Sequence, residues 1–373
     1  MPSQSTTSRT GLLDRARQVA GTAAQYAADA DTSRELAPAV VDGLVKAGFA
    51  RHFVPARFGG SQGTTTELLE AVAALAEGCA SAAWCASVTA GAARMCAFLP
   101  EAGQRELWQR GADTVVVGAL MPRGAVTEVA GGWRVTGEWE FTSAVGFSHW
   151  ALVCALVPQG ERHEPWFFAL PRADYQVADT WSAVGMRGTG SHTLSVDNVF
   201  VPRHRGFPRD AMLAGRAVGS TARCHTAPLR LISGLLFAAP ALGAARAALR
   251  VWSEHTAMDA DEHNPGPRLT AARAASTLDA AGLLLERAAR VADAPAATPL
   301  EQVRNPADCA HAVDQLVDVV ERLFRTVGST GQLAAHPLQR IWRDVHCLAS
   351  HVALRFDTAG GAYGARLLEP AAV

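Results

Sequence analysis

In the first hundred residues, apolar side chains recur every three or four positions, which is the period of an amphipathic helix. Two such runs occupy residues 12–23 and 36–45. Thr64 followed by Glu67 supplies a capping residue and an acidic first turn for a further helix. Residues 80–99 are small and apolar almost all round, so a helix there is expected to be buried on several sides.

The pattern changes near residue 115, where short runs of β-branched and aromatic residues appear. Glycine, proline and aspartate separate these runs, as they separate the strands of small antiparallel structures. The runs occupy residues 115–117, 133–141, 150–156, 166–170 and 193–201. The sequence therefore predicts a small antiparallel barrel or sandwich between roughly residues 119 and 210.

From about residue 226 the helical period returns and persists. The expected helices are long enough to form a four-helix bundle. They cover residues 229–254, 268–293, 308–327 and 338–356. The three regions together predict an α+β protein with an N-terminal helical domain (1–118), a central β domain (119–212) and a C-terminal four-helix bundle (213–373).

Composition excludes several classes of protein. Of the 373 residues 49% are hydrophobic, so the chain can bury a large core and is not intrinsically disordered. A formal net charge of -1 argues against nucleic-acid binding as its main task, and no long uncharged apolar run predicts a membrane span. Residues 1–10 are too polar for a signal peptide, and the seven cysteines show no CxxC spacing. Reduced thiols in a cytoplasmic protein are expected.

The common catalytic signatures are absent from the sequence. It contains no GxGxxG that opens a helix after a strand, no GxxxxGK[ST] phosphate loop and no GxSxG nucleophile elbow. It also lacks HExxH and paired-cysteine zinc spacing. His346 and His351 would diverge by about 140° around one helix, so they make a poor metal pair and no metal site is expected.

Three short motifs remain, two in the predicted β domain and one in the bundle. They are W-E-F-T-S from Trp139, V-G-M-R-G-T-G-S from Val184, and G-S-T-G from Gly328, which precedes an R-D-x-H-type helix reaching His351. In this order and in an α–β–α chain, they resemble the acyl-CoA dehydrogenase superfamily over about residues 12–368. They are closer to one branch, the two-component flavin-dependent monooxygenases. That branch includes hydroxyphenylacetate hydroxylase oxygenases, dibenzothiophene monooxygenases and nitrososynthases.

The resemblance implies an acyl-CoA dehydrogenase-like fold and leaves two reactions open. A dehydrogenase needs a carboxylate base to take the α-proton of a thioester. Residues 353–361, where the family places that base, contain no glutamate and offer only Asp357, and residues 226–243 contain no acid. An oxygenase that works through a flavin C4a-hydroperoxide instead needs an enclosed apolar pocket, a hydrogen bond near flavin N5 and a donor near the peroxide. The sequence favours a monooxygenase, with an FAD-dependent desaturase using a non-standard base as the alternative.

The resemblance also implies roles for individual residues. Ser143 matches the serine beside flavin N5, and His351 matches the histidine that donates to the hydroperoxide or takes a substrate proton. Trp139 would wall the isoalloxazine ring. The other expected cofactor contacts are Thr142, Arg187, Ser191, Ser329 and Gly331.

Several of these residues have ordinary structural explanations as well. Taken alone, Ser143 is a turn former and His351 a core or interface histidine. Arg187 either fixes the turn that follows it or binds a cofactor phosphate. Trp84 is either a core residue or part of the substrate wall.

Two positions depart from the phenol hydroxylases of this branch. Where those relatives carry a histidine and a serine for a phenolate oxygen, this chain has Ala92 and Gly118. Simple phenol ortho-hydroxylation is therefore doubtful and a bulkier substrate is favoured, in contact with Trp84, Ala92, Gly118 and His351. Residues 258–266 lack the arginine with which FAD-using relatives reach a neighbour's pyrophosphate, which favours FMN over FAD.

The sequence thus predicts a homotetrameric flavin-dependent monooxygenase, the oxygenase component of a two-component system. It would receive reduced FMN, with FAD as the alternative, from a separate NAD(P)H:flavin reductase. Its expected substrate is an aromatic, polycyclic or amino-bearing natural-product intermediate, as in antibiotic biosynthesis. A non-catalytic scaffold is a third hypothesis, against which Ser143 and His351 argue. No nucleic-acid or membrane partner is expected.

Overall fold

The computed structural model describes residues 11–160, 162–258 and 264–369. Its N-terminal helices are α1 (Leu12–Gln25), α2 (Ala27–Ser33), α3 (Pro38–Ala47), α4 (Thr65–Ala76), α5 (Ala80–Met95) and α6 (Glu101–Leu107). The predicted start of α4 is confirmed, because Thr64 accepts from the backbone N–H of Glu67 while the Glu67 side chain accepts from that of Thr64. Helix α5 is buried along nearly its whole length, as its small residues predict.

The central region forms one sheet of eight strands. The strands are β1 (Val116–Ala119), β2 (Ala125–Val129), β3 (Gly132–Thr142), β4 (Trp150–Gln159), β5 (Arg162–Pro171), β6 (Gln176–Ala178), β7 (His192–Pro202) and β8 (Gly206–Pro208). They are hydrogen-bonded in the order β6-β7-β3-β2-β4-β5-β8, and β1 pairs with β4. Most pairs are antiparallel as expected, but β4 pairs in parallel with both β1 and β2. The β2–β3 hairpin lies between β1 and β4 in the chain. The predicted domain boundaries at 118 and 212 stay a prediction.

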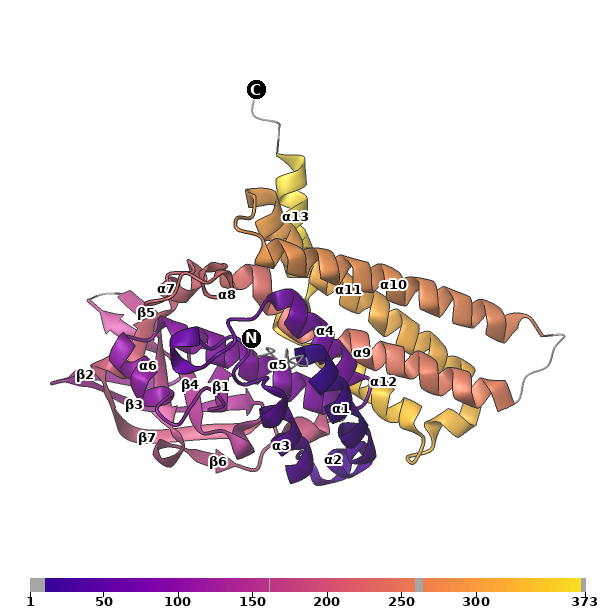
Figure 1. The fold of residues 1–373 in the computed structure, drawn as a ribbon, viewed down its shortest axis with the longest axis horizontal. Helices are drawn as coiled ribbons and strands as arrows, with labels where there is room; N and C mark the ends of the chain where they lie inside the picture. Colours follow the sequence, from indigo (N-terminus) through magenta and orange to yellow (C-terminus); the bar gives the residue numbers. More distant parts are fainter. Residues whose placement is uncertain (1–10, 161, 259–263, 370–373) are drawn as a thin grey trace, which may run out of the picture.

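Seven α-helices follow the sheet in the described residues, where the sequence predicts four long ones. They are α7 (Arg209–Leu213), α8 (Arg223–Thr226), α9 (Leu229–Met258), α10 (Gly266–Asp293), α11 (Pro299–Thr326), α12 (Pro337–Ala349) and α13 (Phe356–Leu368). Helix α11 begins at Pro299 instead of 308, because Thr298 and Glu301 form a capping box that starts the helix there. Helix α12 ends at Ala349, and the separate α13 protrudes from the bundle (Figure 1).

Helix α9 lies at the centre of the molecule. By length and composition its segment Leu229–Ala257 could cross a membrane. However, 83% of the most apolar 18-residue stretch of this segment is buried inside the protein. It packs against α4, α5, α10, α11 and α12, while α5 also contacts β1. Its hydrophobicity is therefore that of a core helix. Helix α5 lies between the sheet and the long helices, in contact with β1 and with α9 (Figure 1).

The α4–α9 contact gives a test of this packing. A Cβ at Gly243 would lie 1.9 Å from the carbonyl oxygen of Ala73 and 2.6 Å from Cβ of Ala76, so the two helix backbones touch. We expect Gly243→Ala to lower the free energy of unfolding by about 1–3 kcal/mol, because the helices must move apart. The measurement is urea unfolding followed by circular dichroism.

Gly21→Ala is the matched control for this substitution. Gly21 lies in α1, is exposed, and an added Cβ would meet no described atom within 4 Å. The control should raise stability by about 0.5–1 kcal/mol, because alanine is the better helix former. Equal effects of the two substitutions would contradict the close α4–α9 contact.

Candidate active site

Residues predicted from distant parts of the chain meet around the indole of Trp84 on α5. Its Nε1–H donates to the hydroxyl of Ser143, which follows β3, at 3.0 Å. The Trp84 and His351 rings lie edge to face with centroids 5.6 Å apart, and both contact the ring of Phe237 on α9. Ser143 and His351 therefore both contact a single indole.

His351 caps η8 (Val352–Leu354) and does not lie on α12, which ends at Ala349. Its Nδ1 accepts the backbone N–H of Ala353 at 3.2 Å, so the neutral imidazole carries its proton on Nε2. Burial lowers the pKa of His351 to about 4. The ring is therefore neutral at pH 7 and presents an Nε2–H donor. This fits the expected donor role, whereas a base at Nε2 would have to break the cap first.

Ser143 is the first of three successive hydroxyl groups. Its Oγ lies 2.7 Å from Oγ of Ser191, which lies 2.7 Å from Oγ1 of Thr189. Thr189 donates to the backbone carbonyl of Met186 at 2.8 Å. Ser191, an expected cofactor contact, is thus hydrogen-bonded to Ser143. Thr189 is a further residue of this group that was not predicted from the sequence. A hydroxyl two residues before a predicted ligand is the signal that was available.

Trp139 and Thr142 point into the sheet domain. The Trp139 side chain is 1% exposed, and its Nε1–H donates to the Cys154 carbonyl at 2.8 Å. The Thr142 hydroxyl, also buried, donates to the Trp139 carbonyl. The expectation that Trp139 walls a flavin ring is therefore wrong for this structure, because the ring has no open surface. The proton of the Thr142 hydroxyl is already donated to the Trp139 carbonyl, so it is not free for a cofactor.

Phe141 is the aromatic side chain exposed beside Ser143. It is 69% exposed and has φ = +60°, at a register irregularity between β3 and β7. In a regular strand Phe141 would share the buried face of Trp139, but the left-handed backbone turns it outward, 6.1 Å from the ring of Trp181. Residues held in such backbone conformations cluster at functional sites. Period-two alternation alone would predict a buried Phe141.

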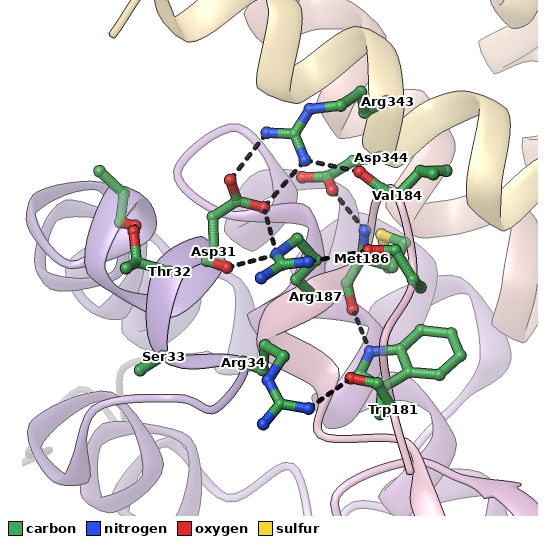
Figure 2. Close-up of polar contacts among 12 residues, drawn as sticks. Asp31, Thr32, Ser33, Arg34, Trp181, Val184, Met186, Arg187, Arg343 and Asp344 are labelled. Carbon is green, nitrogen blue, oxygen red and sulfur yellow. Dashed lines mark hydrogen bonds and ion pairs between the residues drawn. The ribbon is translucent and has the colours of Figure 1, made fainter. Parts of the chain in front are cut away.

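The loop before β7, residues 179–191, is held by an ion-pair network (Figure 2). Arg187 donates from Nε to the backbone carbonyl of Asp31 on α2 at 2.6 Å and from Nη1 to that of Ala183. The Asp31 carboxylate accepts two hydrogen bonds from Arg343 of α12, at 3.1 and 2.7 Å. Arg187 thus fixes the loop against α2, which is the structural alternative considered for it. The Arg187 guanidinium lies 3.7 Å from the Asp31 carboxylate, which takes the place that a cofactor phosphate would have in the other alternative.

Asp344, next along α12, holds the same loop from the interior. Its Oδ1 accepts the backbone N–H of Met186 at 2.5 Å (Figure 2). A Cβ at Gly185 would lie 2.2 Å from the Arg343 carbonyl oxygen, so loop and helix meet backbone to backbone. Asp344 is 6% exposed, and burial raises its pKa to about 6. The loop that carries the hydroxyl groups is therefore fixed by α2 and α12 together.

Ala92 and Gly118, the expected substrate contacts, are neighbours. A Cβ at Gly118 on β1 would lie 3.6 Å from Cβ of Ala92 on α5 and 3.3 Å from a methyl group of Leu120. Ala92 is eight residues after Trp84 on the same helix, about 12 Å along its axis. The two small residues therefore adjoin each other between α5 and the sheet, and Ala92 lies about 80° around the helix axis from Trp84.

Ser329 and Gly331 do not join this cluster within one chain. Both lie in η7 (Gly328–Gln332) before α12, whereas His351 follows α12. The 13 residues of α12 span about 20 Å at the helical rise, so the expected contacts lie at opposite ends of this helix. Within the described ranges, no group of three or more His, Cys, Asp or Glu side chains could hold a metal ion.

Two family models match this chain. The acyl-CoA dehydrogenase N-terminal domain matches residues 6–112, and the acyl-CoA dehydrogenase C-terminal domain matches residues 235–356. The chain is also 31% identical to the flavin-dependent monooxygenase oxygenase subunit HsaA of Rhodococcus jostii (strain RHA1), over 86% of this chain and 88% of that protein. The chain belongs to the acyl-CoA dehydrogenase superfamily.

Further relatives place it in the monooxygenase branch of that superfamily. The FADH2-dependent resorcinol hydroxylase oxygenase component of Rhizobium sp. (strain MTP-10005) is 28% identical over 96% of this chain and 94% of that protein. The crystal structure of 3-HSA hydroxylase from Rhodococcus sp. RHA1 has a TM-score of 0.91 at 28% identity and covers 98% of this chain and 99% of its own. The chain is a flavin-dependent monooxygenase of the oxygenase-component type. The fold and the enzyme class expected from the motifs are confirmed.

Asp344→Asn tests the buried carboxylate that holds the loop. Between its ordinary pKa of 3.8 and about 6, the folded state binds more protons at Asp344 than the unfolded state, so ionisation makes the wild type less stable as pH rises. An asparagine can still accept from Met186 without that cost. The variant should therefore match the wild type near pH 4 and exceed it above pH 6, by at most about 3 kcal/mol.

The measurement is urea unfolding of both proteins from pH 4 to pH 8. The exposed Asp42→Asn on α3 is the control and should stay within about 0.5 kcal/mol of the wild type throughout. A variant that is less stable than the wild type at pH 7 would show that the charge of Asp344 stabilises the loop.

Proposed function

We propose that this monooxygenase takes a reduced flavin from a separate NAD(P)H:flavin reductase and holds it beside Trp84, with Ser143 at flavin N5. His351 would donate to the oxygen that the flavin activates. The observation that supports this assignment is the indole of Trp84, which hydrogen-bonds Ser143 and contacts the His351 ring. The resorcinol hydroxylase relative is itself named an FADH2-dependent oxygenase component.

The side chains of the candidate site suit an isoalloxazine ring. Ser143 offers a half-buried hydroxyl, Phe141 an exposed aromatic face, and His351 a neutral N–H donor. Trp84 and Phe237 add apolar surface that excludes water from the reacting atoms. The bound flavin would supply the electrons and react with O2. The chain's own part is to orient that ring at Ser143 and to keep an uncharged donor at His351.

The desaturase alternative lacks a suitable base. Asp357 is exposed, pairs with Arg355 and accepts the backbone N–H of Thr358. The hydrogen bond from Arg355, followed by that of Thr358, lowers the pKa of Asp357. A solvated, ion-paired carboxylate is a weaker base than the buried one that removal of a C–H proton requires. We therefore favour oxygenation.

The substrate we propose is a bulky aromatic, polycyclic or amino-bearing compound, such as an intermediate of antibiotic biosynthesis. Ala92 and Gly118 place two minimal side chains against each other at about 12 Å from Trp84 along α5. Neither can bind a phenolate oxygen through its side chain. A substrate recognised mainly by its apolar surface suits this part of the site.

The choice between FMN and FAD depends on contacts beyond the ring. The segment 258–266 contains no arginine, which favours FMN, but residues 259–263 lie outside the described residues. The resorcinol hydroxylase relative is named for FADH2. Dissociation constants for reduced FMN and reduced FAD, measured side by side, decide between the two.

A homotetramer is the assembly we propose. Helix α13 has no buried residue, and Leu367 and Leu368 at its end are 57% and 85% exposed. Ser329 and Gly331, about 20 Å from His351 along α12, would reach a flavin only from a second subunit. We expect light scattering of the purified protein, at neutral pH and physiological salt, to give a molar mass about four times the 39.2 kDa of one chain. A monomer at micromolar concentration would contradict the assembly.

His351→Ala tests the donor role. We expect the variant to bind reduced flavin within about twofold of the wild type, because Ser143 and Trp84 are unchanged. After mixing with O2, the bound flavin should return to its oxidised form roughly tenfold faster, because one charge-free donor to the activated oxygen is lost. More hydrogen peroxide and less product should form per flavin. Stopped-flow absorbance and a peroxide assay measure these quantities.

The control for this test is His346→Ala on the preceding helix. The Nδ1 of His346 lies 2.8 Å from the Trp342 carbonyl oxygen and its Nε2 lies 3.5 Å from Glu321, so its ring has partners of its own. This variant should keep the wild-type rate of flavin oxidation. Wild-type peroxide release in His351→Ala would remove the assigned role.

A further inference from the structure

The three hydroxyl groups beside Trp84 form a chain with two fixed ends. The chain runs from Trp84 Nε1 to Ser143 (3.0 Å), then Ser191 (2.7 Å), Thr189 (2.7 Å) and the carbonyl of Met186 (2.8 Å). Ser191 is 5% and Thr189 2% exposed, so both hydroxyls find their partners inside the protein. Ser143 is half-buried, at the end nearest Phe141.

The chemistry of the ends decides which way the hydroxyl protons point. An indole N–H only donates and a carbonyl oxygen only accepts, whereas each hydroxyl has one proton and two lone pairs. Because Thr189 gives its proton to Met186, it accepts from Ser191, and Ser191 then accepts from Ser143. All three protons therefore point away from Trp84 and from the open side of Ser143. The Ser143 oxygen has one lone pair left for an outside donor.

We propose that Thr189 and Ser191 are positioning residues that make this site prefer reduced over oxidised flavin. The inference rests on the proposed function, in which Ser143 meets flavin N5. A reduced flavin carries N5–H, which donates to the free lone pair of Ser143 and leaves the chain intact. An oxidised flavin has an N5 that only accepts. To donate to it, Ser143 must turn its proton outward, and Ser191 and Thr189 must turn theirs as well.

When the three hydroxyl protons turn toward the flavin, the hydrogen bond from the Thr189 hydroxyl to the Met186 carbonyl is lost. One net hydrogen bond in a protein corresponds to roughly a two- to tenfold change in an equilibrium constant. The Met186 carbonyl keeps two other donors, the backbone N–H of Thr189 and the Nε1–H of Trp181. The loop can therefore tolerate either direction, and the hydroxyl of Thr189 decides between them.

Thr189→Val is the decisive variant, since it removes the hydroxyl and keeps the shape of the side chain. Ser191 then has only Ser143 to donate to, so the Ser143 proton is turned toward the flavin and oxidised flavin is favoured. We expect the ratio of the dissociation constants of oxidised and reduced flavin to fall about tenfold. A tenfold fall lowers the two-electron potential of the bound flavin by about 30 mV. Ser191→Ala, which removes the acceptor for Ser143, should shift the ratio in the same direction.

The measurement is an anaerobic titration of the full chain with oxidised and with photoreduced FMN, repeated with FAD, read by quenching of tryptophan fluorescence. Thr193→Val is the matched control, because its hydroxyl bonds to Oγ1 of Thr180 at 2.7 Å and not to this chain of hydroxyls. It should keep the wild-type ratio. Unfolding curves of each variant check that the fold is retained.

The outcomes separate the inference from the function on which it rests. A wild type that binds reduced flavin together with a Thr189→Val variant of unchanged ratio would overturn the inference alone. The inference is also overturned if Thr193→Val changes the ratio as much as Thr189→Val does. A wild type that binds neither redox form would overturn the proposed flavin site itself.

Discussion

The hydrogen bond from the Trp84 indole to the Ser143 hydroxyl is the interaction on which the site depends. It joins a buried helix of the N-terminal domain to the end of a strand in the sheet, at 3.0 Å, and the same ring contacts His351 after α12. An indole suits this position because it is apolar over most of its surface and has one N–H to donate. A phenylalanine would pack there but leave the hydroxyl with one donor fewer. The three parts of the chain therefore meet at a residue that both fills space and orients a polar group.

The charged side chains near this site are partly exposed, and the buried ones favour their neutral forms. The ion pairs of Asp31 with Arg187 and Arg343 lie at the partly exposed edge, with 22–28% of each side chain accessible, where solvent reduces their cost. Further in, His351 is neutral with a pKa near 4, and Asp344 has a pKa raised to about 6 because burial disfavours its charge. The Trp84 indole itself contacts the Ser143 hydroxyl, the Phe237 ring and the neutral His351 imidazole. A site of this kind offers hydrogen-bond donors without fixed charge.

Much of the fold follows from patterns that act over short stretches of chain. Helical periodicity and the capping box at Thr64 locate α4, because both are local. The start of α11 lies earlier than expected, because Pro299 occupies the first turn, where proline is accepted, and Thr298 caps the helix, while Pro306 is tolerated inside it. The outward direction of the Phe141 side chain depends on one positive φ, which alternation does not encode. The His351 tautomer and the hydroxyl chain depend on partners far away in sequence, so only the folded structure shows them.

The same fold can serve two reactions because the chemistry resides in a few side chains. Removal of a C–H proton needs a carboxylate, and a carboxylate placed against Trp84 and Phe237 would have its pKa raised by burial, as that of Asp344 is. Such a charge would also compete for the Ser143 proton and turn the hydroxyl chain around. In this chain the acid nearest to His351 in the motif segment, Asp357, lies at the surface in an ion pair. Activation of oxygen on a reduced flavin instead calls for uncharged donors, which are the groups that Ser143 and His351 offer beside Trp84.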